Sequence, residues 1–321
     1  MLKVLIKRLL QMILVLLIVS LIVFVLSSMI GDPVSLMVPE NASPKEIQAA
    51  REYLGLDKPV YIQYLIFMKN VVNGNFGRSY RYYQPAMKVI LERVPATLEI
   101  VLLSVLITGA LSVIFGVYSG AYPKRSSSKA IMTFSIMGIS LPSFWLGMMM
   151  IFVFSIHFGW LPPSGRGQLG SFLGIKSSLF TLDGLKHLLL PAITLSLGNI
   201  ATLIRLIRAG MQETLKQDFI KYARSKGVSQ KDVLYRHALP NTLIPVITIF
   251  GLQVGELIAF TTITETVFAW PGIGKLLIDS IYSVDKPIIV SYLMIVSAMF
   301  VVINFLVDIA YIIVDPRISI K

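Results

Sequence analysis

Six runs of apolar residues constrain this chain more than any other feature of its sequence. A helix needs about 20 mostly apolar residues to cross the hydrocarbon core of a bilayer, and all but the fourth run reach that length. Backbone polar groups in hydrocarbon must pair within the chain, so we expect each run to be helical; the strands of a membrane barrel would instead alternate apolar and polar residues. The predicted spans are residues 9–30, 96–122, 130–156, 188–204, 243–264 and 287–314.

The composition agrees with lipid as the main solvent of this chain. Charged residues make up 14% of the sequence, against about 25% in a soluble domain, and 55% of the residues are hydrophobic. The first run is about twice as long as the apolar core of a signal peptide, and no small-x-small cleavage site follows it, so we expect a retained first helix. The absence of Cys excludes disulfides, thiolate metal sites and Cys nucleophiles.

The distribution of charge predicts the orientation of the chain in the membrane. With the N-terminus inside, the predicted cytoplasmic segments carry 16 Lys and Arg residues against four acidic residues. This excess equals the net charge of +12 of the whole chain. Lys and Arg concentrate in the cytoplasmic loops of membrane proteins, so we expect a multi-pass protein with both termini in the cytoplasm. The charge requires no nucleic-acid partner.

The largest predicted outer segment is residues 31–95, between the first two spans. Ser43 is placed to cap a helix in which Pro44 is the first residue and Glu46 the third, which is the pattern of a capping box. We expect a small external subdomain that is too short to build a good core alone. Two further outer loops are residues 157–187 and 265–286.

The long inner loop, residues 205–240, is basic and rich in helix-forming residues. Its pattern predicts helices at residues 212–226 and 229–239 on either side of Gly227, as in a helix–turn–helix hairpin. A solvated basic loop beside anionic lipid head groups is the alternative interpretation. At helical spacing, one face of the first helix would carry Phe219, Tyr222, Ala223 and Lys226.

The sequence contains no recognisable catalytic motif. It has no phosphate-binding G-x-x-x-x-G-K-[S/T] loop, no H-E-x-x-H and no G-x-S-x-G, and its three His residues are far apart. Carboxylates inside predicted spans are functional candidates. We expect Glu99 to cap a helix or pair with a cation and Asp308 to pair with a loop Arg. Glu256, the deepest, either lines a polar translocation path, binds a cationic group or hydrogen-bonds to a partner helix.

The inner loop resembles the cytoplasmic coupling loop in permease subunits of bacterial ABC importers. The family pattern is E-A-A-x-x-x-G, then nine residues, then I-x-L-P. This chain keeps four of those positions and departs at three. The kept residues are Ala223, Gly227, Leu239 and Pro240, and the departures are Lys221, Tyr222 and His237.

Eight further segments, in order along nearly the whole chain, resemble the first permease subunit of dipeptide/oligopeptide-type ABC importers. They are LGLDKP at 54–59 with Gln63 and Tyr64, GNFGRSY at 74–80, RVPATLE at 93–99, LPSFWLG at 141–147, GWLPPSG at 159–165, LPAITL at 190–195, ETVF at 265–268 with PGIG at 271–274, and DPRI at 315–318.

The resemblance implies an all-α, type I ABC importer fold in a bacterial inner membrane and a non-catalytic transport subunit. It implies a homologous second permease, two cytoplasmic ATPases that hold ATP and Mg, and an external solute-binding protein; this chain would hold no cofactor or metal. The implied division is a first helix (1–30), an external segment (31–95), a transmembrane domain (96–314) with a coupling loop (211–240), and a tail (315–321). The coupling residues implied are Tyr222, Ala223, Arg224, Lys226, Gly227, Arg236, His237, Leu239 and Pro240.

Three alternatives stay open at this stage. The same architecture imports glutathione or chelated nickel as well as di- and oligopeptides, because specificity lies largely in the binding protein. An ATP-independent secondary transporter would need inverted repeats, and none is evident in the sequence. A membrane enzyme would need a catalytic pair inside the spans, which the sequence does not offer.

Overall fold

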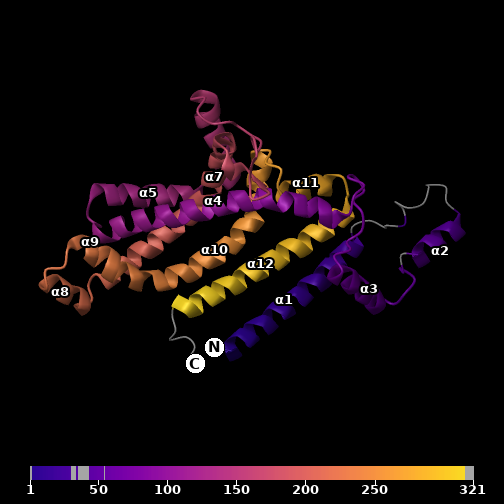
Figure 1. Cartoon of the computed structure of the whole chain (residues 1–321), viewed down its shortest axis with the longest axis horizontal. Helices are drawn as coiled ribbons and strands as arrows, with labels where there is room; N and C mark the ends of the chain where they lie inside the picture. The colour runs from indigo at the N-terminus through magenta and orange to yellow at the C-terminus, as the bar shows by residue number, and fades with distance from the viewer. Residues whose placement is uncertain (1, 30–33, 35–42, 54, 315–321) are drawn as a thin grey trace.

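The computed structural model describes residues 2–29, 34, 43–53 and 55–314; the predicted tail and its DPRI segment lie outside the described residues. Long helices run side by side along the longest axis of the molecule (Figure 1). One end of this bundle carries the helices of the inner loop, and the other carries the outer helices. The long apolar helices indicate the direction in which the protein crosses the membrane, because only they are long enough to span a bilayer.

Five helices are long and apolar enough to cross a membrane, and a bent pair of helices makes a sixth if it counts as one span. This agrees with the six predicted spans, although most helices extend past the predicted bounds. The helices are α1 (Leu2–Met29), α4 (Ala86–Ala121), α7 (Leu182–Thr214), α10 (Leu239–Val267) and α12 (Lys286–Val314), and the bent pair is α5 (Ser126–Ser140) with α6 (Ser143–Met150).

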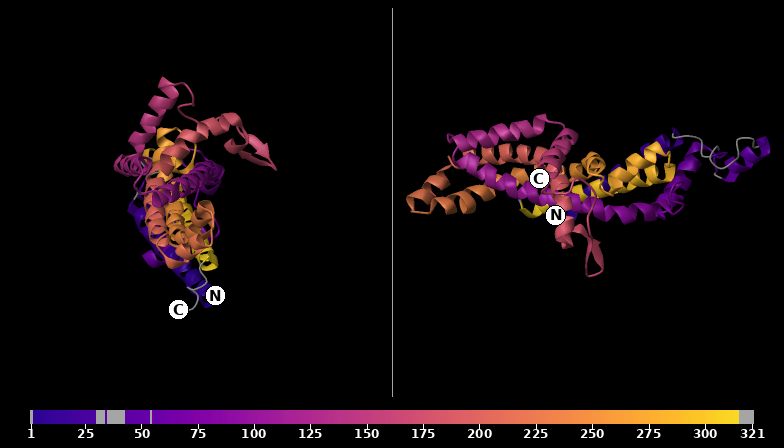
Figure 2. Two further views of the ribbon diagram at one scale, coloured as in Figure 1. Left: turned by 90° about the vertical axis from the view of Figure 1, so that its left-hand side faces the viewer. Right: turned by 90° about the horizontal axis from the view of Figure 1, so that it is seen from above.

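The prediction of one continuous span at residues 130–156 is wrong. α5 and the segment formed by α6 and the π-helix η2 (Ile151–His157) meet at an angle of 111°. Leu141 has an extended backbone (φ −96°, ψ 135°), as expected for a residue before proline, and Pro142 has no N–H to continue the helix. The break therefore turns half of the predicted span away from the bundle (Figure 2).

Short elements connect the long helices. On the outer side, β1 pairs antiparallel with β2 in a hairpin that extends from the bundle in a different direction from α6 (Figure 2). The short elements are α2 (Pro44–Tyr53), α3 (Val60–Val72), β1 (Gly170–Phe172), β2 (Ile175–Ser177), η3 (Ser178–Phe180), α8 (Asp218–Ser225), α9 (Gln230–Asp232), η4 (Val233–Ala238) and α11 (Ile273–Tyr282).

The capping box predicted at the start of α2 is confirmed. The Ser43 N–H donates to a Glu46 carboxylate oxygen at 2.7 Å, and the Glu46 N–H donates to the Ser43 hydroxyl at 3.4 Å. The bonds from the backbone and hydroxyl of Ser43 lower the pKa of Glu46. In the rest of the outer segment, α3 packs on the outer end of α1, where Phe24 meets Tyr64 edge-on at 5.5 Å between ring centroids.

Among the described elements, α4 and α7 share the most extensive helix–helix interface, and a stripe of small residues on α4 allows it. Every fourth residue of this stripe is small and buried: Ser104, Thr108, Ser112, Gly116 and Gly120. Helices in lipid gain little from the hydrophobic effect, so they associate through close packing at small residues and hydrogen bonds across the interface. The stripe follows the i, i+4 rows of a helix surface, which brings it along one side of α7.

The contacts of this stripe show how near the two backbones lie. A Cβ at Gly116 would lie 2.7 Å from the Cβ of Ile207, and one at Gly120 would lie 2.6 Å from the Cβ of Met211. Toward the outer end, the Ser104 hydroxyl donates to the Ala192 carbonyl at 3.0 Å. α4 and α7 therefore form a rigid pair on which the other elements pack.

We expect Gly116→Ala to destabilise the protein, whereas Gly109→Ala on the same helix does not. The Cβ at Gly116 would overlap Ile207, and overpacking of this kind costs about 1–3 kcal/mol. At Gly109 the new Cβ meets Phe250 at an ordinary 3.6 Å, so the higher helix propensity of Ala decides the outcome. Thermal unfolding in detergent measures both variants, and equal melting temperatures would contradict the packing argument.

Candidate functional site

The inner loop lies at one end of the bundle, as α8 and α9 in Figure 1. The predicted helix at 212–226 is wrong in its extent, because α7 ends at Thr214 and α8 begins at Asp218. Gln217, the N-cap of α8, has an extended backbone (φ −71°, ψ 153°), which separates the two helices. The second predicted helix, 229–239, continues without a gap through η4 into α10. The loop is thus joined at both ends to spans.

Two faces of α8 have opposite surroundings. Ile220 is fully buried and Ala223 is 8% exposed, and Ile220 belongs to a core cluster with residues of α4, α7, η4 and α10. Phe219 and Tyr222 face outward, and Tyr222 is 61% exposed. The prediction that Ala223 shares a face with Phe219 and Tyr222 is therefore wrong: the bundle takes Ala223, and the aromatic residues remain on the surface.

The predicted turn at Gly227 closes α8. Gly227 has a φ of +76°, a conformation in which glycine avoids the steric penalty of a Cβ. Its N–H donates to the Arg224 carbonyl at 3.0 Å, and the Val228 N–H donates to the Ala223 carbonyl at 3.2 Å. These two bonds are the Schellman arrangement that satisfies the last carbonyls of a helix. Ser229 then caps α9 through the Asp232 N–H at 3.2 Å.

The other residues predicted for the coupling loop differ in their exposure. Arg224, Lys226, Arg236 and Pro240 are exposed, His237 is half-buried and Leu239 is buried. The Lys226 ammonium lies 4.6 Å from the centre of the Tyr222 ring. Tyr222 and the exposed residues Arg224, Lys226, Arg236 and Pro240 make an aromatic and basic patch at α8. The contact of this patch with an ATPase stays a prediction.

A second candidate site is a cavity of about 410 Å³ near the middle of the spans. Its walls come from the α5–α6 break, α7 and α10, and Glu256 is exposed to it. Among the residues that the structure describes, none hydrogen-bonds to the Glu256 carboxylate or forms an ion pair with it. The lining residues are Gly138, Ile139, Leu141, Ser143, Leu146, Thr194, Leu195, Gly198, Asn199, Thr202, Glu256, Leu257 and Phe260.

The other two predicted membrane carboxylates are paired. Glu99 is 5% exposed and forms a bidentate ion pair with Arg166, at 2.6 and 3.0 Å, which confirms the predicted pairing. The Ser178 N–H also donates to Glu99, so this carboxylate anchors the β-hairpin to α4. Asp308 pairs with Arg8 of α1 at 3.2 Å, and not with an Arg of the inner loop as predicted.

Glu265 is a buried carboxylate that sequence reasoning did not single out. It accepts from the Thr97 hydroxyl at 2.6 Å and from the Lys275 N–H at 2.9 Å, and Thr97 in turn accepts from the Ile273 N–H at 2.9 Å. Together they cap the N-terminus of α11, where negative charge is favourable. Trp270 adds a bond from its indole N–H to the Ala96 carbonyl at 2.8 Å. These contacts join three segments that the sequence connected only through their resemblance to the family. RVPATLE, ETVF and PGIG therefore form one structural unit.

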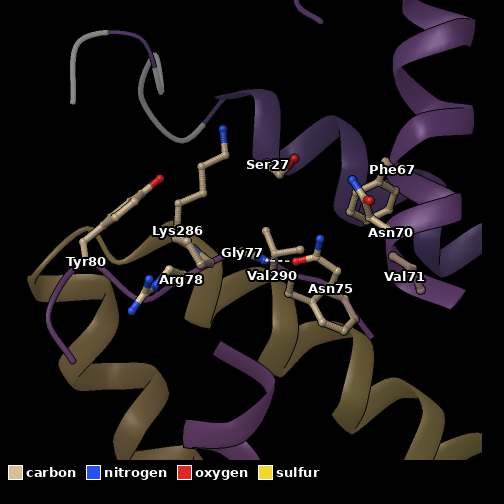
Figure 3. A pocket seen from close by; sticks show the side chains of 12 residues that line it. Ser27, Phe67, Asn70, Val71, Asn75, Gly77, Arg78, Tyr80, Lys286 and Val290 are labelled. Carbon is tan, nitrogen blue, oxygen red and sulfur yellow. Dashed lines mark hydrogen bonds between the residues drawn. The ribbon is translucent and has the colours of Figure 1, made fainter. Parts of the chain in front are cut away.

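Another buried carboxylate, Asp285, ties the GNFGRSY segment to the start of α12. Asp285 is fully buried and accepts from the Ser79 hydroxyl and from the N–H groups of Tyr80 and Arg81, both at 3.3 Å. Burial and the nearby Asp285 charge raise the pKa of Tyr80. The same segment lines an outer cavity of about 370 Å³ between α1, α3 and α12, with Arg78, Tyr80 and Lys286 on one side and Phe67 and Val71 on the other (Figure 3).

The described residues contain no group of three or more His, Asp or Glu side chains that could hold a metal ion. His157 packs edge-on against Phe158, with 4.8 Å between ring centroids. His187 places Nδ1 2.9 Å from the carbonyl oxygen of Asp183. Both residues thus have packing or hydrogen-bonding roles at the outer surface.

The fold and the two sites define a multi-pass membrane transport subunit with a structured inner loop. The model of the family "Binding-protein-dependent transport system inner membrane component" matches residues 112–320, and the model of its N-terminal region matches residues 1–101. The chain belongs to this family, and it is therefore a permease subunit of an inner-membrane importer that depends on a binding protein.

Named relatives cover almost the whole chain. It is 40% identical to the di/tripeptide transport system permease protein DppB of Pseudomonas aeruginosa, over 92% of each chain. It is 38% identical to the oligopeptide transport system permease protein AppB of Bacillus subtilis, also over 92% of each. Among solved structures, the inward-facing MetNI methionine ABC transporter matches 71% of this chain and 97% of its own, with a TM-score of 0.53 and 16% identity, which supports the type I importer fold.

We expect Arg166→Gln to destabilise the outer face by about 3–5 kcal/mol, because it leaves the Glu99 charge buried without a partner. Thermal unfolding and limited proteolysis of residues 157–187 measure the loss. The double variant Glu99→Gln with Arg166→Gln is the control: it should recover part of the stability, since neither charge is then left alone. Additive losses would contradict a direct pairing.

Proposed function

We propose that this chain is one of two permease subunits in an ATP-driven importer of short peptides. The observation that carries the proposal is the exposed aromatic and basic patch of α8, set at the inner end of the bundle. An apolar helix face fits the groove of a partner protein, and surrounding basic residues orient it against acidic groups. A pair of cytoplasmic ATPases, which bind ATP and Mg and carry out all the catalysis, is the partner that we assign to this patch and its counterpart.

Two long helices connect this patch to the Glu256 cavity. α7 lines the cavity with Thr194, Asn199 and Thr202 and ends at Thr214, three residues before α8, while α10 lines it with Glu256 and begins directly after η4. Ile220 of α8 packs in the same core cluster as residues of both helices. A displacement of α8 by the ATPases therefore moves two walls of the cavity, which is what alternating access requires.

The remaining features of the proposal concern the outer face and the substrate. A homologous second permease completes the path, and a binding protein docks on residues 31–95, 157–187 and 265–286 to deliver the ligand. The names of the relatives above support peptides as the substrate class. The excess of Lys and Arg on the α8 side supports cytoplasmic termini.

Purification through a tag on this chain tests the assembly. A second permease and two ATPases should copurify, and the binding protein with its peptide should stimulate ATP hydrolysis. Transport by this chain alone, without ATP, would overturn the proposal.

Tyr222→Ala should weaken ATPase association about tenfold or more, because an exposed aromatic anchor at the centre of an interface typically contributes about 2 kcal/mol. ATPase copurification and peptide uptake in proteoliposomes measure the effect. Tyr282→Ala is the matched control, since Tyr282 is 86% exposed on α11 at the other end of the bundle and should leave ATPase association unchanged. Full coupling in the Tyr222 variant would count against this patch as the ATPase contact.

A further inference from the structure

The break between α5 and α6 leaves backbone donors at the edge of the Glu256 cavity. Pro142 is the N-cap of α6, no side chain caps the helix, and the first helical bond runs from the Leu146 N–H to the Pro142 carbonyl. The N–H groups of residues 143–145 are thus the unsatisfied donors of a helix N-terminus. Leu141 and Ser143, on either side of the cap, line the cavity. A helix N-terminus carries a partial positive charge and binds anions such as carboxylates.

Glu256 provides the opposite charge on the α10 side of the same cavity. It is exposed to the cavity, and among the described residues no cation pairs with it. A carboxylate at this depth in a membrane is costly to retain without a role. Asn199 and Thr202 of α7 also line the cavity and offer neutral hydrogen-bonding groups.

Apolar side chains make up much of the remaining wall of the cavity. The neighbouring lining residues Leu195, Leu257 and Phe260 are apolar and would accept side chains of varied size.

We propose that this cavity binds a short peptide through its free termini. Glu256 holds the α-ammonium group, the N-terminus of α6 holds the α-carboxylate, and Asn199 and Thr202 bond to the peptide backbone. In transporters, the N-termini of interrupted helices commonly meet anionic substrate groups near the middle of the membrane. The cavity volume of about 410 Å³ lies in the range of small-ligand sites. This inference rests on the proposed function and adds that the permease itself, and not only the binding protein, selects free peptide termini.

Equilibrium binding of radiolabelled trialanine to the purified complex of this permease with its partner subunits tests the inference. The measurement is made without the binding protein, both nucleotide-free and ATP-bound, so that the selectivity of the binding protein does not enter. In one of the two states the wild-type complex should bind trialanine at least tenfold more tightly than N-acetyl-trialanine and than trialanine amide. Equal binding of the three peptides, or no binding of trialanine in either state, overturns the inference.

Glu256→Gln assigns the ammonium site. The variant should bind trialanine at least tenfold more weakly and N-acetyl-trialanine as the wild type does, because the blocked peptide has no ammonium group to lose. Glu92→Gln, on the exposed outer part of α4, is the matched control and should bind all peptides as the wild type does. Unchanged trialanine binding by the Glu256 variant, or an equal loss for both peptides, overturns the assignment. ATP-driven trialanine uptake by the wild type, measured in parallel with the binding protein present, decides the proposed function separately.

Discussion

The contact between α4 and α7 is the constraint on which the other elements depend. Two apolar helices gain almost no free energy by exchanging lipid contacts for each other, so their association must come from contacts that lipid tails cannot make. Gly116 and Gly120 bring the backbones together, and Ser104 bonds to a carbonyl of α7. α7 in turn carries the inner loop at one end and the hairpin at the other. The pair therefore sets the distance between the outer loops and the exposed patch at α8.

Buried carboxylates organise the outer end in a different way. Glu99, Glu265 and Asp285 each lie among groups that donate hydrogen bonds, and each joins segments more than 60 residues apart in the sequence. Glu256 differs from all three, because it faces a cavity and not a set of donors. Three carboxylates complete their bonding within the chain, whereas the fourth finds no partner among the described residues. This contrast supports the proposed role of Glu256 as a binding group more directly than its depth in the membrane does.

Much of this architecture could be predicted from the sequence, and the failures have physical causes. Hydropathy predicted the spans because it reports the length of an apolar run. It does not report whether the chain bends within that run, so the turn at Pro142 was not predicted, although a proline in the middle of the run was a visible signal. A helical wheel grouped Ala223 with Tyr222, since local periodicity does not reveal which side another helix will cover. Glu265 escaped attention because its partner, Thr97, lies in a different span. The small-residue stripe of α4 was readable at a period of four.

The broken helix also has a consequence for the biogenesis of the protein. Backbone that leaves the helical state at membrane depth persists only when protein or a water-filled cavity covers it. The turn at Leu141 and Pro142, with the exposed apolar faces of α6 and η2, is such a stretch, and this chain supplies one side of its surroundings. In the proposed assembly a second permease covers the other side, and a copy without that partner would be incomplete in the lipid. Unequal synthesis of the two proposed permeases would then produce unpaired chains for the proteases of the membrane to remove.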